Sequence, residues 1–193
     1  THQFKGRRPG GFVMTYSTLA SIVKYPYPSV LAGKKSKFGF FTTETEDYLK
    51  IAEELGIKRL NPEGEPIKYA RHPLVFLVEA ADDICYQMMD IEDAYKLKLL
   101  TPDETTELML TFVEESRRAR VEETFRMVTD RNEQIAYLRS KVIGILIDEC
   151  ADVFMRHEEE ILNGTFNAPL IKHASERLRD AYKHCSEVAV QKI

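Results

Sequence analysis

Apolar residues recur at intervals of three and four along most of this chain, which is the period of one face of an α-helix. No stretch alternates apolar and polar residues as a half-buried strand does, and no tight hairpin signal appears. The pattern therefore predicts an all-α protein. The predicted helices cover residues 12–23, 43–55, 71–100, 102–115, 117–128, 131–156 and 171–190.

Several of these boundaries carry local signals. Thr43 with Glu46, and Thr101 with Glu104, match the capping box, in which two side chains satisfy free N–H groups at a helix start. Gly56 stands where the helix that begins at Thr43 should end, because glycine tolerates the left-handed conformation common after a last turn. These signals predict sharp joints between the helices.

The longest helical pattern, residues 71–100, is the one around which the chain is organised. A row of polar side chains, Asp82, Tyr86 and Asp90, repeats every four residues and therefore projects from one side of that helix. The acidic residues beside this row are Glu79, Asp83 and Asp93. The apolar positions of the same helix form a stripe expected to face a core, made of Leu74, Leu77, Val78, Ala81, Cys85 and Met88.

Acidic side chains at this density on a helix that also carries a core stripe are costly unless something compensates their charge. A metal ion, a basic cluster or bulk water can do so. Two interpretations follow. Either the row is a solvated face, or Asp82 binds a metal while Tyr86 and Asp90 line a ligand pocket. The spacing alone leaves both open.

Composition and charge narrow the class of protein. The chain has 193 residues, 44% hydrophobic and 30% charged, as expected for one globular domain or a large part of one. Its net charge of −4 argues against bulk nucleic-acid binding. No apolar run approaches the roughly 20 residues that span a bilayer, and the N-terminus lacks the apolar run of a signal peptide. Three cysteines, Cys85, Cys150 and Cys185, are expected to be buried, reduced thiols, which indicates a cytoplasmic protein.

Three stretches resemble one enzyme family, in the family's order. Residues 79–94, EAADDICYQMMDIEDA, resemble the helix that carries the last metal ligand of the deoxyguanosine triphosphate triphosphohydrolase (dGTPase) family, which belongs to the HD-domain phosphohydrolases. Residues 15–26, TYSTLASIVKYP, resemble the segment leading into its Lys-Tyr-Pro turn, and residues 138–171 resemble its C-terminal helical region. The specific part is the string AADDI-x-Y-x-x-x-D. The resemblance implies the C-terminal part of an HD-domain-like helical bundle.

The resemblance also implies roles for individual residues. The family hydrolyses a deoxynucleoside triphosphate to a deoxynucleoside and triphosphate, with a metal held by a histidine, a His-Asp pair and a distant aspartate. Asp82 matches that aspartate. Tyr86 is then expected to stack on the sugar or base, and Asp90 to accept a hydrogen bond from the deoxyribose 3′-hydroxyl. Lys24 and Lys37 are expected to contact the triphosphate. The divalent metal ion, whether Mn, Mg, Fe, Co, Ni or Zn, stays open.

The chain departs from the family in its metal ligands, because none of its five histidines is followed by aspartate. We therefore expect it to be part of a larger enzyme and inactive alone, with no catalytic residue of its own. Residues 1–100 would belong to the HD-type catalytic domain and residues 101–193 to the C-terminal helical region. Apolar surface exposed by such a part predicts a homo-oligomer, for which the family suggests a hexamer. dGTP is expected as substrate by analogy, and nucleic acid only as a regulator.

The alternative is a non-enzymatic helical module for regulation or assembly. The two hypotheses differ at Asp82, Tyr86 and Asp90. The enzyme hypothesis predicts that these three converge on one surface with Lys24 or Lys37 nearby. The module hypothesis predicts an exposed row without a basic partner. Arg139 is likewise open between a structural ion pair and a phosphate contact.

Overall fold

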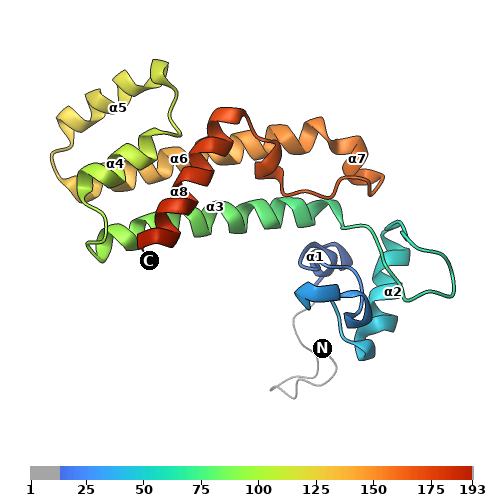
Figure 1. The fold of residues 1–193 in the computed structure, drawn as a ribbon. Helices are drawn as coiled ribbons and strands as arrows, with labels where there is room; N and C mark the ends of the chain where they lie inside the picture. Colours follow the sequence, from blue (N-terminus) through green and yellow to red (C-terminus); the bar gives the residue numbers. More distant parts are fainter. Residues whose placement is uncertain (1–13, 193) are drawn as a thin grey trace, which may run out of the picture. The chain divides into compact units, whose positions relative to one another are not determined.

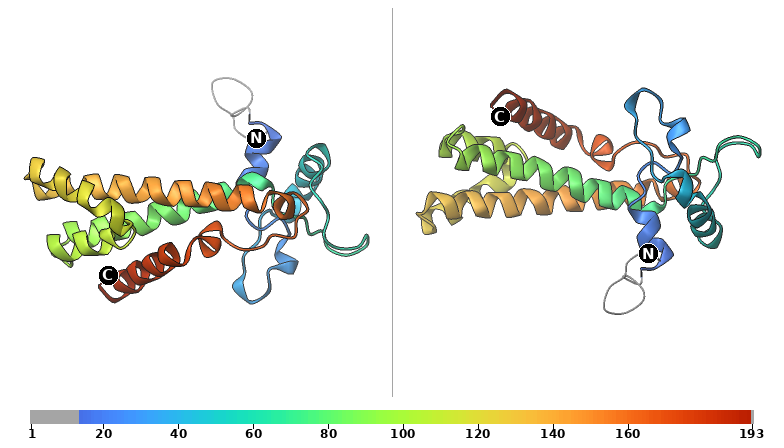
Figure 2. Two further views of the ribbon diagram at one scale, coloured as in Figure 1. Left: turned by 90° about the horizontal axis from the view of Figure 1, so that it is seen from above. Right: turned by 90° about the horizontal axis from the view of Figure 1, so that it is seen from below.

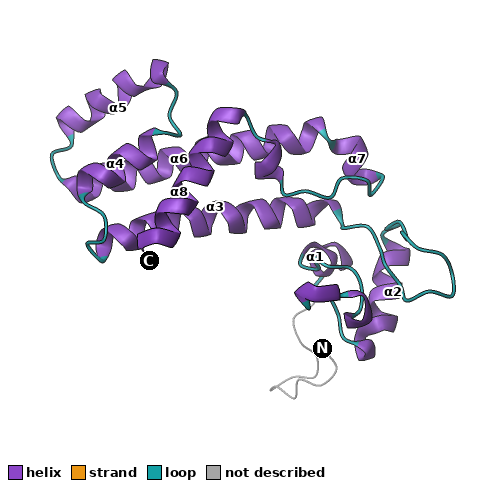
Figure 3. Cartoon of the chain, in the orientation of Figure 1, coloured by secondary structure: helices purple, strands orange, loops and turns teal. Residues whose placement is uncertain are grey.

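The computed structural model describes residues 14–192 and confirms the all-α prediction, because this range contains no strand beyond one isolated bridge between Arg59 and Tyr69 (Figures 1 and 3). Short 3₁₀ turns lie at Ser29–Leu31, Gly33–Lys35, Thr42–Glu44 and Leu170–His173. The α-helices of this range are α1 (Tyr16–Ser21), α2 (Thr45–Glu54), α3 (Pro73–Lys96), α4 (Pro102–Leu110), α5 (Glu115–Met127), α6 (Arg131–Arg156), α7 (Glu158–Leu162) and α8 (Glu176–Lys192).

The chain forms two compact units. The first unit runs to Val78 and includes Glu158–Asn167, and the second comprises Glu79–His157 and the chain from Ala168 onward. Helix α3 begins in the first unit and continues in the second. The predicted boundary at residue 100 separates the HD-type catalytic domain from the C-terminal helical region, and it stays a prediction.

The second unit is built on two long antiparallel helices, α3 and α6. These lie side by side in all the views, with α4 beside α6, and α8 runs obliquely across α3 (Figures 1 and 2). Each of the four helices contributes side chains to the core, as the recurrence of apolar residues every three or four positions predicts. Fully buried examples are Met88, Ile91, Met109, Leu138, Leu146 and Leu178.

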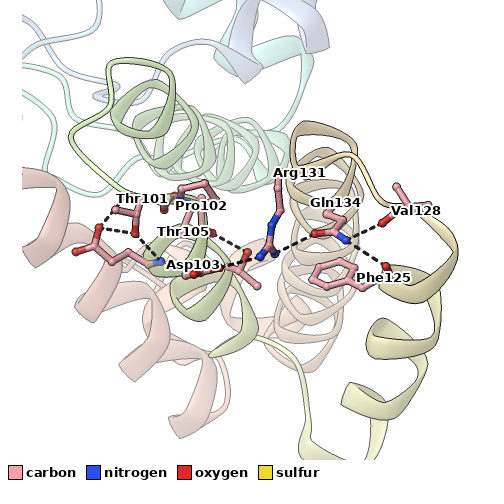
Figure 4. A network of polar contacts seen from close by, with 10 residues as sticks. Thr101, Pro102, Asp103, Thr105, Phe125, Val128, Arg131 and Gln134 are labelled. Carbon is pink, nitrogen blue, oxygen red and sulfur yellow. Dashed lines mark hydrogen bonds and ion pairs between the residues drawn. The ribbon is translucent and has the colours of Figure 1, made fainter.

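A polar network joins α4, α5 and α6 (Figure 4). Gln134, buried near the start of α6, donates from Nε2 to the carbonyl oxygens of Phe125 (3.2 Å) and Val128 (2.6 Å) at the end of α5. The last carbonyls of a helix have no partner within it, so Gln134 satisfies groups that would otherwise be costly to bury. Arg131 donates to Gln134 Oε1 (3.2 Å) and pairs with Asp103 of α4 (3.2 Å).

Two predicted helix boundaries are confirmed. Thr101 Oγ1 accepts the N–H of Glu104 (3.2 Å), and Glu104 Oε2 accepts the N–H of Thr101 (2.7 Å), which completes the capping box before α4. Gly56 follows α2 with a φ of 61°, in the left-handed region that glycine adopts without strain.

The capping box predicted at Thr43 with Glu46 is wrong. Glu44 instead accepts the N–H of Phe41 through Oε2 (2.9 Å). The physical reason is the 3₁₀ turn Thr42–Glu44, which precedes α2 and takes up the residues expected to start it.

Helix α3 buries a different face from the one predicted. Of the predicted stripe, only Met88 is buried, whereas its other members, Leu74, Leu77, Val78, Ala81 and Cys85, are exposed. The buried apolar positions are Val75, Phe76, Ala80, Ile84, Met88, Ile91 and Ala94. Apolar residues surround most of the first half of this helix, so the helical period fits more than one face.

The cysteines also divide into buried and exposed residues. All three are free thiols, and Cys150 and Cys185 are buried as expected. Burial raises the pKa of Cys150 to about 11 and that of Cys185 to about 12. The expectation of burial is wrong for Cys85, which is exposed on α3.

Five helices are shorter than predicted, and two of them are α2, at Thr45–Glu54 against 43–55, and α4, at Pro102–Leu110 against 102–115. Helix α1 covers only part of residues 12–23, of which 12 and 13 lie outside the described residues. Helix α3 ends at Lys96 because Lys98 turns left-handed, with a φ of 60°. Helix α8 begins at Glu176 because Leu170–His173 forms a 3₁₀ turn and Ala174 is extended.

Candidate functional site

The row of Asp82, Tyr86 and Asp90 lies on an exposed side of α3 in the second unit. All three side chains are exposed, Tyr86 at 61% of its surface. Residues four apart on a helix lie one above the other with a small rotation, so the row extends over about 12 Å of the helix. A carboxylate, a phenol ring and a second carboxylate are therefore accessible along one line, an arrangement that fits a ligand site and a solvated face alike.

The lysines expected to contact the phosphates lie in the first unit. Lys37 is exposed, and its Nζ lies 5.8 Å from the centre of the Tyr25 ring. Lys24, the residue before Tyr25, is half-buried. The structure therefore brings Lys37 to the Lys-Tyr-Pro turn that contains Lys24. The convergence of these lysines on the row of the second unit stays a prediction.

Gly39 is the reason the two lysine segments can approach each other. Its N–H donates to the carbonyl of Tyr27 (3.1 Å). A Cβ atom at this position would lie 2.2 Å from the Tyr25 carbonyl oxygen and 2.6 Å from Val23 Cγ1. No side chain fits between these backbones, so glycine is required for the close approach.

A small aromatic core supports this arrangement. Phe40 stacks on Tyr48 with ring centres 4.6 Å apart, and Tyr69 meets Tyr48 edge-on at 5.8 Å. Burial raises the pKa of Tyr48 well above its usual value. The Tyr69 N–H donates to the carbonyl of Pro26 (3.0 Å) and so ties the Lys-Tyr-Pro turn to this core.

Replacing Gly39 with alanine is expected to destabilise the first unit by about 1–3 kcal/mol, because the backbone of Tyr25 must move to admit the methyl group. Urea denaturation monitored by tyrosine fluorescence measures the loss. Gly33→Ala is the control for an open position, since nothing lies within 4 Å of its Cβ and the only cost is its φ of 58°. Equal effects of the two substitutions would contradict the close approach at Gly39.

Arg139 is engaged in an ion pair with Glu92 of α3, which favours its structural role over a phosphate contact. Lys96 also reaches Glu92, at 3.0 Å. The hydrogen bond from Lys96, together with Arg139, holds the pKa of the Glu92 carboxyl below its ordinary value. The guanidinium of Arg71 lies 5.6 Å from the centre of the Phe76 ring in the first unit.

The residues present do not complete a metal site. Among the described residues, no three His, Cys, Asp or Glu side chains cluster as metal ligands would. Asp82 therefore offers one carboxylate ligand at most, and a metal held by it would need further ligands from outside this range.

The contacts that α8 makes with α3 next to the row were not predicted from the sequence. Tyr182 Oη donates to the backbone carbonyl of Asp83 (3.1 Å), and Ser186 Oγ lies 2.6 Å from Gln87 Oε1, to which it donates. The partners in each pair are 99 residues apart, so no local pattern connects them. In the sequence, only the four-residue spacing of Tyr182 and Ser186 indicates that the two side chains lie on one side of a helix.

Comparison with known proteins identifies the relatives of this chain. No family model matches it. The deoxyguanosinetriphosphate triphosphohydrolase-like protein of Pseudomonas aeruginosa is 34% identical over 199 aligned residues, which cover 100% of this chain and 42% of the relative. Over its whole length the chain is thus similar to deoxyguanosinetriphosphate triphosphohydrolase-like proteins. The dGTPase-family resemblance predicted from residues 79–94 is thereby confirmed.

A relative from a second organism agrees. The protein of the same name from Synechocystis sp. is 34% identical over 183 residues, which cover 86% of this chain and 38% of the relative. The chain thus spans about two-fifths of the length of the curated relatives it matches.

Proposed function

We propose that this chain is the C-terminal part of a metal-dependent dNTP triphosphohydrolase that converts dGTP to deoxyguanosine and triphosphate. The names of the full-length relatives support the reaction class and the guanine base. The observation that carries the proposal for this chain is its 34% identity to the Pseudomonas aeruginosa relative over its whole length, which includes the stretch with Asp82, Tyr86 and Asp90.

Each residue of the row has a role suited to its chemistry. The Asp90 carboxylate accepts a hydrogen bond from the deoxyribose 3′-hydroxyl, and the Tyr86 ring packs on the sugar or base. Lys24 and Lys37 donate to the triphosphate, whose negative charge demands cationic partners. Asp82 supplies one oxygen ligand to the metal. Because the described residues do not complete that metal site, we assign no catalytic step to this chain alone.

Assembly and location are further parts of the proposal. Ala81, Cys85 and Met89 expose apolar surface on α3 beside the row, which supports the predicted homo-oligomer. The hexameric state, the cytoplasmic location and regulation by nucleic acid stay predictions. None of the helices within residues 14–192 combines the length and apolar character needed to span a bilayer.

A second candidate is the non-enzymatic helical module. It is favoured by the exposure of the row, which this hypothesis predicts, and by the lack of a three-ligand metal cluster within residues 14–192. In that case the row is a solvated face, and the chain serves regulation or assembly.

Triphosphate release from dGTP separates the two candidates. We expect the 193-residue chain alone to release none, and the full gene product to release triphosphate only when a divalent metal is present. The assay separates triphosphate from monophosphate by ion-exchange chromatography, with Mn²⁺ added or chelated. Robust hydrolysis by the isolated chain, or none by the full gene product, would contradict the proposal.

A further inference from the structure

Two side-chain contacts connect α8 to α3 at successive turns. Tyr182 and Ser186 are four residues apart on α8, and their partners Asp83 and Gln87 are four residues apart on α3. Residues at this spacing lie one above the other on a helix. The two hydrogen bonds, of 3.1 and 2.6 Å, therefore form a pair of rungs between the same sides of the two helices.

The second rung is buried, which makes it costly to lose. Gln87 is only 5% exposed, and its Nε2 has no hydrogen-bond partner among the described residues. Its Oε1 depends on Ser186. A buried amide that lost this remaining contact would have neither polar end satisfied. The rung therefore opposes any rotation of α3 that moves Gln87 away from α8.

The rungs lie directly beside the row. Asp83 follows Asp82 in the chain, and Gln87 follows Tyr86. Burial, with smaller contributions from Asp83 and Asp90 of α3, raises the pKa of Tyr182 to about 12. The two contacts of α8 thus lie within the part of α3 that carries the row.

Resting on the function proposed above, we propose that Tyr182 and Ser186 are positioning residues. Their hydrogen bonds to α3 fix the rotation of that helix so that Tyr86 and Asp90 face the deoxynucleoside part of a dNTP. Neither residue needs to touch the ligand. A rotation of α3 by part of a turn would carry Tyr86 and Asp90 sideways by several ångströms, because both side chains extend well beyond the helix axis.

Hydrogen exchange in the 193-residue chain tests the positioning step without reference to activity. Tyr182→Phe and Ser186→Ala each remove one hydroxyl and keep the packing, and we expect exchange of the α3 amides near Gln87 to become about tenfold faster. Ser186→Thr keeps a hydroxyl and should restore protection. Tyr95→Phe is the matched control, because it removes a 2.6 Å bond from the same helix to Asn132 of α6. Unchanged exchange near Gln87 in both rung variants would overturn the inference.

Kinetics of the full gene product test the link to the ligand. We expect Tyr182→Phe and Ser186→Ala to raise the KM for dGTP about tenfold, more than they lower kcat, and Ser186→Thr to restore it. Tyr95→Phe should leave KM unchanged. Faster exchange with an unchanged KM would overturn the role toward dNTP. If the wild-type gene product releases no triphosphate, the proposed function fails, and the exchange data still decide whether α8 positions the row.

Discussion

Replacing Asp82 with alanine is expected to reduce metal-dependent triphosphate release by the full gene product about 1,000-fold or more. The side chain is exposed on α3 and stands where the family's last metal ligand is expected. Loss of one carboxylate ligand weakens metal binding and removes several kcal/mol of charge stabilisation, and each 1.36 kcal/mol is a tenfold change in rate. The measurement is the initial rate of triphosphate release at saturating Mn²⁺.

Asp93→Ala is the matched control for this substitution. Asp93 is an exposed aspartate on the same helix but stands outside the row. The Asp93→Ala substitution removes the same charge and should leave the rate of triphosphate release within about twofold of wild type. Both variants should keep wild-type stability, because both side chains are exposed. A folded Asp82→Ala variant with wild-type activity would show that Asp82 holds no metal.

Replacing Met88 with alanine should destabilise the chain by about 2–5 kcal/mol, whereas Met89→Ala should cost less than about 1 kcal/mol. The two methionines are adjacent on α3, but Met88 is 1% exposed and Met89 is 54% exposed. Truncation of the buried side chain leaves a cavity among close-packed neighbours, while truncation of the exposed one does not. Urea denaturation of both variants measures the difference in the free energy of unfolding.

This pair of methionines also tests which face of α3 is buried. A large loss at Met89 would mean that the exposed face packs against another surface in solution, as the predicted homo-oligomer could provide. That outcome is recognised by repeating the denaturation at several protein concentrations, because the stability of an oligomer depends on concentration. A small loss at Met88 would contradict the described core.

Much of the helical architecture could be predicted because it depends on local pattern. Helix α6 runs over the predicted residues 131–156, where a regular apolar period coincides with a cap by Asp130, whose Oδ1 accepts the N–H of Glu133 (3.0 Å). The capping box at Thr101 was predicted for the same reason. The exposed row of α3 could also be predicted as a row, since a four-residue spacing defines one side of a helix.

Other features depend on contacts between distant parts of the chain. The period of α3 fits several faces, and only its neighbours in space decide that Ile84 is buried and Cys85 exposed. The contacts of Tyr182 and Ser186 with α3 join residues 99 apart. The local sequence around a hydroxyl group on an amphipathic helix does not indicate its hydrogen-bond partner. The error at Thr43 has a local cause, because a 3₁₀ turn competes with an α-helical start in the same few residues.

The coding sequence upstream of Thr1 tests the central claim most directly, because one aspartate cannot hold a catalytic metal by itself. The account predicts an in-frame extension that encodes a histidine and, further along, a His-Asp pair on helical patterns. These would supply the ligands that the described residues lack. A reading frame that starts at or near Thr1 would contradict the enzyme account, and the non-enzymatic helical module would then take its place.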